Sequence, residues 1–138
     1  MSTQWIWTLA GVLALSSLLL AADGFVVVVN RANPTVAMSQ ADLQDLFLGK
    51  KTTLPGGGAA VVVLMEGGAA HNAFLSGLVK KNSSQFDSYW KKVIFTGTGA
   101  SPRYVKGEAE MLEAVKGNVN AIGYLAKDDA AVKTVAIK

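Results

Sequence analysis

A glycine-rich turn, Glu66 to Asn72, holds the residues of this chain best suited to binding a small anion. It reads EGGAAHN and leads from an apolar run into a helical pattern. The first backbone N–H groups of a helix lack partners within the helix and carry partial positive charge, so an anion can dock against them. The candidate ligands here are Gly67, Gly68, Ala69, Ala70, His71 and Asn72. A tight turn without a ligand is the alternative, and Glu66 adds a negative charge beside it.

A second loop of small polar residues offers another edge for such a site. It reads TGTGASPR, and its hydroxyls and guanidinium come from Thr96, Thr98, Ser101 and Arg103. The loop follows a helical pattern and lacks a third glycine, so it does not match a dinucleotide-binding fingerprint. It also lacks the Gly-Lys-Ser/Thr of a P-loop. A loop that merely ends a helix is the alternative interpretation.

Residue counts exclude several classes of chemistry. The chain has no cysteine and one histidine, which excludes disulfides, thiol nucleophiles and a His-cluster metal site within one chain. No G-x-S-x-G sequence accompanies His71, and Glu110 and Glu113 lie on the outer side of a predicted amphipathic helix. We therefore expect no enzyme activity, no cofactor and no metal. A net charge of +3 without a contiguous basic face also argues against nucleic acid as a partner. The dibasic pairs, including Lys91-Lys92, are expected at or near helix ends.

The elements that must position these residues alternate along the chain. Apolar runs predict strands, and apolar residues spaced three and four apart predict helices. The strands are expected at 25–30, 59–64, 121–125 and 132–137. The helices are expected from Ser39, over 70–81, from Ser83 or Ser84, and over 108–116. This alternation predicts an α/β sandwich, with 25–30 as a strand buried on both faces, as in a parallel sheet.

The N-terminal segment differs sharply from the rest. The chain is 51% hydrophobic with 17% charged residues, yet residues 1–22 contain no charged side chain. An apolar stretch that ends in Ala21-Ala22 is typical of a signal peptide. The sequence thus predicts an exported chain, periplasmic or secreted, with a signal at 1–22 and one domain at 23–138. A retained membrane helix over 5–22, attaching the protein to a membrane, and a buried helix in an assembly are the alternatives.

Four motifs in order resemble phosphate-binding proteins of bacterial phosphate-uptake ABC transporters. The first, LQDLFLGKKTTLPGG, is similar to L-x-x-I-F-x-G-x-x-x-x-W-x-x-G, with Leu54 at the tryptophan position. VVVLMEGGAAHNAFLSGLV resembles the strand, turn and helix that hold the anion in that family. YWKKVIFTGTGASP and EAVKGNVNAIGYLA resemble two later segments. Where the family has Ser-Gly-Thr and an arginine, this chain has Gly67-Gly68-Ala69-Ala70 and His71.

The resemblance covers residues 25–127 and is closest to short, exported members of the superfamily. It implies a single-lobe type II periplasmic-binding-protein-like fold, with a mixed, mostly parallel sheet flanked by helices. It also implies a solute-binding-like domain for phosphate or another small oxyanion, associated with uptake or sensing. The partners implied are the anion, a membrane transporter or sensor, and, for a single lobe, a second copy of the chain. The alternative is a structural or interaction protein, such as an envelope, adhesive or self-assembling subunit, that reuses the fold without a small ligand.

Overall fold

The computed structural model describes residues 24–97 and 101–138 of the chain. The predicted export signal at 1–22 and the candidate ligand Thr98 lie outside the described residues.

The described strands form one sheet in the order β2-β6-β1-β5-β3-β4. β3 pairs in parallel with both β4 and β5, and β2 pairs in parallel with β6. β1 pairs antiparallel with β5 and β6. The sheet is therefore mixed and mostly parallel, as the resemblance implied. The strands are β1 Val26–Val29, β2 Ala37–Met38, β3 Val61–Met65, β4 Arg103–Val105, β5 Ala121–Leu125 and β6 Lys133–Ile137.

The first predicted strand is present, but its direction was not as expected. β1 is buried as predicted, because it lies inside the sheet with helices over it. It nevertheless runs antiparallel to both of its neighbours. A run of valines indicates a strand buried on both faces. It does not indicate whether that strand runs parallel or antiparallel to its neighbours. The parallel setting predicted for this strand is therefore wrong, while its position in the core is confirmed.

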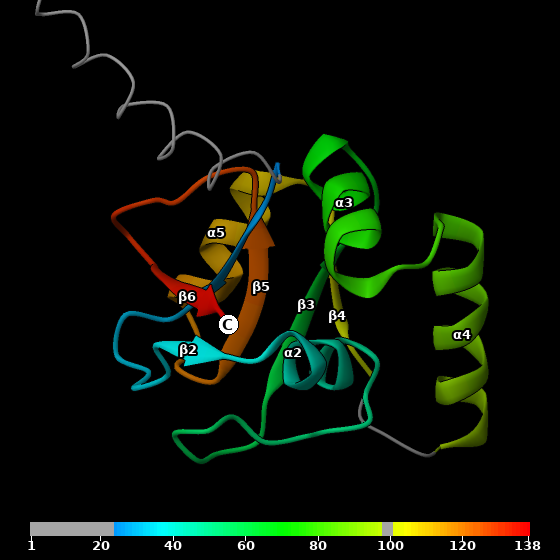
Figure 1. Cartoon of the computed structure of the whole chain (residues 1–138), viewed down its shortest axis with the longest axis horizontal. Helices are drawn as coiled ribbons and strands as arrows, with labels where there is room; N and C mark the ends of the chain where they lie inside the picture. Colours follow the sequence, from blue (N-terminus) through cyan, green and yellow to red (C-terminus); the bar gives the residue numbers. More distant parts are fainter. Residues whose placement is uncertain (1–23, 98–100) are drawn as a thin grey trace, which may run out of the picture.

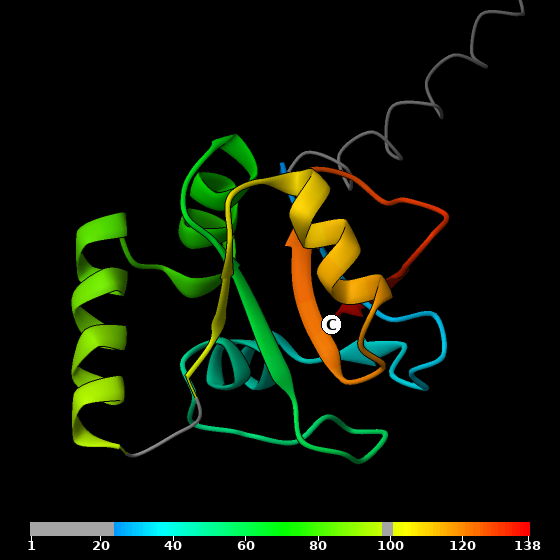
Figure 2. The ribbon, with the colours of Figure 1, turned by 180° about the vertical axis from the view of Figure 1, so that it is seen from behind.

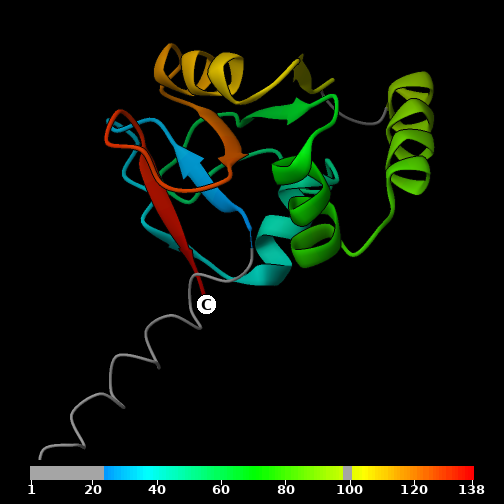
Figure 3. The ribbon, with the colours of Figure 1, turned by 90° about the horizontal axis from the view of Figure 1, so that it is seen from above.

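Helices cover both faces of the sheet. α2 Gln40–Phe47 and α3 Ala69–Phe74, with its π-helical continuation η2 Leu75–Val79, lie on one face. α5 Glu108–Lys116 lies on the opposite face, as seen from behind and from above (Figures 2 and 3). Ser39 caps α2 as its sequence suggested, because its Oγ accepts from the Asp42 N–H at 3.1 Å. These layers put the starts of α3 and α5 at the same edge of the sheet.

α4, Ser83–Thr96, stands beyond the β4 edge of the sheet (Figure 3). Its predicted inward stripe is confirmed, since Phe86 and Trp90 are buried. Trp90 Nε1 donates to the Phe47 carbonyl at 3.1 Å and Tyr89 Oη donates to the Leu48 carbonyl at 2.5 Å, so α4 is tied to the end of α2. The Lys91-Lys92 pair lies in the body of this helix, whose last turn carries no basic residue, so its predicted place at a helix end is wrong.

Candidate functional site

The turn between β3 and α3 has the backbone geometry of a helix start open to solvent. Gly68 caps α3 with a φ of 106°, a left-handed conformation that side chains disfavour. No side chain hydrogen-bonds to this cap. A Cβ built on Gly67 or Gly68 meets no atom within 4 Å, so there is open space above both residues. The first N–H groups of α3 are therefore placed to face an anion from solvent.

A second helix start lies beside the first. β3 and β4 are parallel neighbours, with Met65 opposite Val105, and the Glu66 N–H donates to the Val105 carbonyl at 2.9 Å. The chain leaves β4 into α5, whose cap is Gly107, again without a side-chain hydrogen bond. A Cβ on Gly107 also meets no atom within 4 Å. The starts of α3 and α5 are thus adjacent across one strand pairing.

The two helices leave this edge on opposite faces of the sheet. α3 packs on one face and α5 on the other, although their strands are neighbours (Figure 3). In open α/β sheets, ligands bind outside the carboxyl ends of the strands at a point of this kind. We call the residues Glu66–Ala70 and Lys106–Glu108 the switch-point crevice.

Carboxylates already occupy part of this edge. Glu108 Oε1 accepts from the Ala126 N–H at 2.7 Å, and Glu110 Oε1 accepts from the Lys106 N–H at 2.9 Å. Two backbone donors near the crevice are therefore already paired with the chain's own acids. With Glu66, these acids make the electrostatic setting less favourable to an anion than the helix starts alone would be. An anion bound here would be held mainly by backbone N–H groups.

The side chain of His71 points into the core rather than into the crevice. It is 3% exposed, and its Nδ1 lies 2.6 Å from Tyr124 Oη. Tyr124 Oη also accepts from the Met65 N–H at 2.8 Å. Because the Met65 N–H donates to this oxygen, the hydroxyl proton of Tyr124 is free to point at Nδ1, an arrangement that requires a His71 ring with Nδ1 unprotonated. Burial lowers the pKa of His71, and the charge of Asp87 partly opposes this shift.

The remaining candidates near the turn divide between core and surface. Ala70 is buried with His71 in the core, whereas Ala69 and Asn72 are exposed at the start of α3. The Asn72 N–H donates to the Gly68 carbonyl within the first helical turn, at 3.0 Å. Gly67, Gly68, Ala69 and Asn72 thus remain on the solvent side of the crevice.

The second predicted edge lies elsewhere in the structure. Arg103 pairs with Val63, three residues before Glu66, so roughly 10 Å of strand separates it from the turn. Thr96 lies at the C-terminal end of α4, where its hydroxyl donates to the Lys92 and Val93 carbonyls. The structure therefore does not bring these residues beside Gly67 and Gly68.

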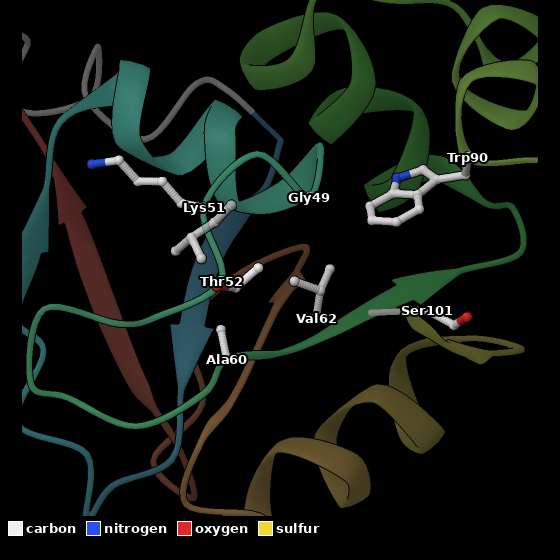
Figure 4. A pocket seen from close by; sticks show the side chains of 8 residues that line it. Gly49, Lys51, Thr52, Ala60, Val62, Trp90 and Ser101 are labelled. Carbon is white, nitrogen blue, oxygen red and sulfur yellow. The ribbon is translucent and has the colours of Figure 1, made fainter. Parts of the chain in front are cut away.

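Ser101 lines a different hollow, between the end of α2 and Trp90 (Figure 4). Its volume of about 20 Å³ is room for about one water molecule and too little for a tetrahedral oxyanion. Its walls include Leu46, Ala60 and Val62, so the hollow is also largely apolar. Ser101 is thus placed against the α2–α4 junction.

Sequence reasoning did not find Gly107. The sequence feature that could have pointed to Gly107 is the short strand β4, Arg103–Val105. This strand ends two residues before Gly107 and so places the glycine at the carboxyl edge of the sheet. Three residues with one buried side chain carry too little periodicity to be read as a strand.

Across 24–97 and 101–138, no helix combines the length and the apolar character needed to cross a bilayer. In the same residues, no group of three or more His, Cys, Asp or Glu side chains is arranged to hold a metal ion.

Solved structures with a similar fold are phosphate-transport proteins. The fold is similar to that of a protein from Clostridium perfringens assigned as a phosphate ABC transporter substrate-binding protein, with bound phosphate (TM-score 0.63, 24% identity over 81% of this chain). It is also similar to an ABC-type phosphate transport receptor from Vibrio cholerae (TM-score 0.61, 19% identity over 81%) and to PstS from Borrelia burgdorferi (TM-score 0.59, 13% over 83%).

These likenesses define the fold class. The chain spans 44%, 45% and 47% of the three proteins, so it has the fold of about half of a phosphate ABC transporter substrate-binding protein. No protein-family model matches the chain, and no curated protein matches it in sequence. The α/β fold implied by the four sequence motifs is thereby confirmed.

Proposed function

We propose that this chain is a solute-binding-like domain that takes phosphate or a similar small oxyanion in the switch-point crevice. The observation that carries the proposal is the pair of adjacent helix starts at Gly68 and Gly107, open to solvent and without side-chain caps. Backbone N–H groups and aligned peptide dipoles at two helix starts favour one negative charge between them. The fold shared with a phosphate-bound transporter protein supports the same ligand class.

The affinity we propose is low. In the described residues the crevice has no hydroxyl from Gly67–Ala70, and Glu66, Glu108 and Glu110 lie at its rim. A ligand on one open edge keeps much of its surface in water, whereas small-molecule sites usually bury most of the ligand. Binding in the millimolar range, which corresponds to about 4 kcal/mol, fits such a site.

The proposal places the protein outside the cytoplasm and without enzyme activity. The uncharged apolar residues 1–22 support export. The three structural neighbours are named for transport and not for catalysis, which supports a membrane transporter or a sensor as the partner.

The test is calorimetric titration of the chain with phosphate, sulfate and arsenate. Gly107→Asp is the informative variant, because Gly107 has an extended φ of −166° that any residue adopts and the space for a side chain. The new carboxylate would cap α5, so the protein should stay as stable or gain roughly a few tenths of a kcal/mol while anion binding is lost. Ser84→Asp adds the same charge to the start of α4 and should leave binding unchanged.

The absence of heat with all three anions at millimolar concentration would refute the proposal. In that case the protein reuses the fold without a small ligand. Equal anion affinity of wild type and Gly107→Asp would instead remove the crevice as the binding site.

A further inference from the structure

The outer side of α4 is a surface without a partner in the described chain. Because Phe86 and Trp90 face inward, the residues half a turn away face solvent. Phe95 is 91% exposed there, and its neighbour Ile94 is 43% exposed. Lys91 lies one turn before Phe95 on the same side, since residues four apart are neighbours on a helix. We call Lys91, Lys92 and Phe95 the α4 outer face.

A groove with an apolar floor and a charged rim lies between β4 and α5. β4 is an edge strand that pairs with β3 alone in the described sheet. The groove has a volume of about 290 Å³, large enough for one aromatic side chain. Its lining residues are Arg103, Tyr104, Val105, Ala109, Glu110 and Glu113.

The floor of this groove is apolar and its rim is charged. Val105 is buried and Tyr104 is 44% exposed, so an aromatic ring seated there would cover apolar surface that is now wet. Glu110 and Glu113 belong to the exposed side of α5. Glu113 pairs with Lys116 at 3.3 Å, and both side chains are exposed. Because an exposed ion pair contributes little free energy, Glu113 can leave Lys116 and pair with a lysine of another molecule.

The two surfaces have opposite charges. The α4 outer face presents Lys91 and Lys92 beside Phe95, and the groove presents Glu110 and Glu113 beside an apolar floor. Because both surfaces belong to the same chain, two copies related by a twofold axis can make the contact twice.

We propose that two copies of this chain associate with Phe95 of each seated in the β4–α5 groove of the other. Lys91 and Lys92 then face Glu110 and Glu113 of the second copy. Glu110 belongs both to the rim of the crevice and to the lining of the groove, but Phe95 is seated beside β4 and not at the ends of the strands.

The test exploits the absence of cysteine from the full chain. Phe95→Cys and Ala109→Cys are made in separate, differently tagged copies of the full chain, mixed and mildly oxidised. The Ala109→Cys copy keeps its own Phe95, so one of the two aromatic contacts remains in the mixed dimer. The disulfide between the two copies should form roughly tenfold or more above background, because the docked geometry raises the effective concentration of the second thiol. The background is set by Val36→Cys mixed with Ala109→Cys, since Val36 is 64% exposed beside β2, at the opposite edge of the sheet.

A charge exchange tests the orientation of the contact. Lys91→Glu with Lys92→Glu in the Phe95→Cys copy should lower the yield of the cross-link. Glu110→Lys with Glu113→Lys in the Ala109→Cys copy should restore it, whereas a yield that stays low would refute the assigned pairing. A cross-link no faster than the Val36→Cys background would overturn the dimer, and circular dichroism of each variant confirms that the comparison is between folded chains.

Discussion

His71, in the turn that leads into α3, serves the core rather than a ligand. Its ring lies among Phe74, Phe86 and Tyr124, with centroid distances of 5.9 to 6.3 Å. The Tyr124 ring stacks on Phe74 at 3.9 Å, and its hydroxyl joins His71 to the backbone of β3. His71 is therefore a neutral, buried link between α3 and the sheet.

This buried histidine should make the stability of the protein depend on pH. Because burial depresses the pKa of His71 in the folded protein, the unfolded chain takes up a proton near pH 6.5 while the folded chain does not. The stabilisation is complete above pH 6.5 and is lost as the pH falls toward the depressed value, by at most about 1.4 kcal/mol per pH unit. Urea unfolding between pH 8 and pH 5 measures this slope. His71→Asn, which keeps an acceptor near Tyr124, should flatten it, and an unchanged slope would contradict the assignment.

Tyr124→Phe should destabilise the protein without touching the crevice. The change leaves the buried Met65 N–H without its acceptor and removes the hydroxyl partner of His71. An unpaired buried donor costs about 1–3 kcal/mol. Tyr104→Phe is the control, because that hydroxyl belongs to a side chain that is 44% exposed, and it should change stability by less than about 0.5 kcal/mol. Equal losses in the two variants, measured by urea unfolding, would contradict the role of the Tyr124 hydroxyl.

At the scale of elements, α4 depends on its first turn more than the other helices do. It stands beyond the edge of the sheet and is held through one face (Figure 1). Its capping box is complete, with Asn82 Oδ1 accepting from the Gln85 N–H at 2.8 Å and Gln85 Oε1 accepting from the Asn82 N–H at 3.0 Å.

Loss of this cap should loosen α4 locally. Asn82→Ala removes one side of the capping box, at a cost of about 1 kcal/mol. Hydrogen exchange should then quicken in α4 and stay unchanged in α5, since the two helices lie on different sides of the molecule. Ser88→Ala, an exposed site in the middle of the same helix, should not speed exchange. Uniform quickening in both helices would show that α4 unfolds with the whole protein.

The elements predicted correctly from the sequence are those with a long apolar pattern and a clear residue at which the pattern stops. The bounds of α5, Glu108–Lys116, and β5, Ala121–Leu125, agree with the structure because a regular apolar stripe stops at Gly117 and a buried run starts soon after. β2 and β4 were missed, since two or three residues at a sheet edge carry almost no periodicity. The direction of β1 depends on partners about 100 residues away, which local pattern does not contain.

The same limits apply to the candidate site. The β3–α3 turn could be located from its glycines, because a turn between a strand and a helix is a local feature. Its proximity to Gly107 and its distance from Arg103 follow from the pairing of β3 with β4, a strand that was not predicted. The sequence therefore predicts the position of Glu66–Ala70 in the site but not that of Lys106–Glu108.

At the scale of the whole molecule, the last strand lies inside the sheet. β6, Lys133–Ile137, is inserted between β1 and β2, with Val135 opposite Val27. Both valines are buried, at 2% and 0% exposure, so the core closes only when the end of the domain pairs with its beginning. Contacts between such distant parts of the chain favour all-or-none folding of the described body over independent folding of its halves.

Val135→Asp tests whether this closure holds the whole body together. A carboxylate at this position has no cationic partner in the core around Val27, and burying an unpaired charge costs several kcal/mol, comparable to the whole stability of a small domain. We expect loss of the cooperative urea transition and of the native circular dichroism. Thr134→Asp, one residue earlier on the exposed side of the same strand, should fold with a midpoint close to that of wild type. A cooperative transition near the wild-type midpoint in Val135→Asp would mean that β6 is dispensable and that the core closes without it.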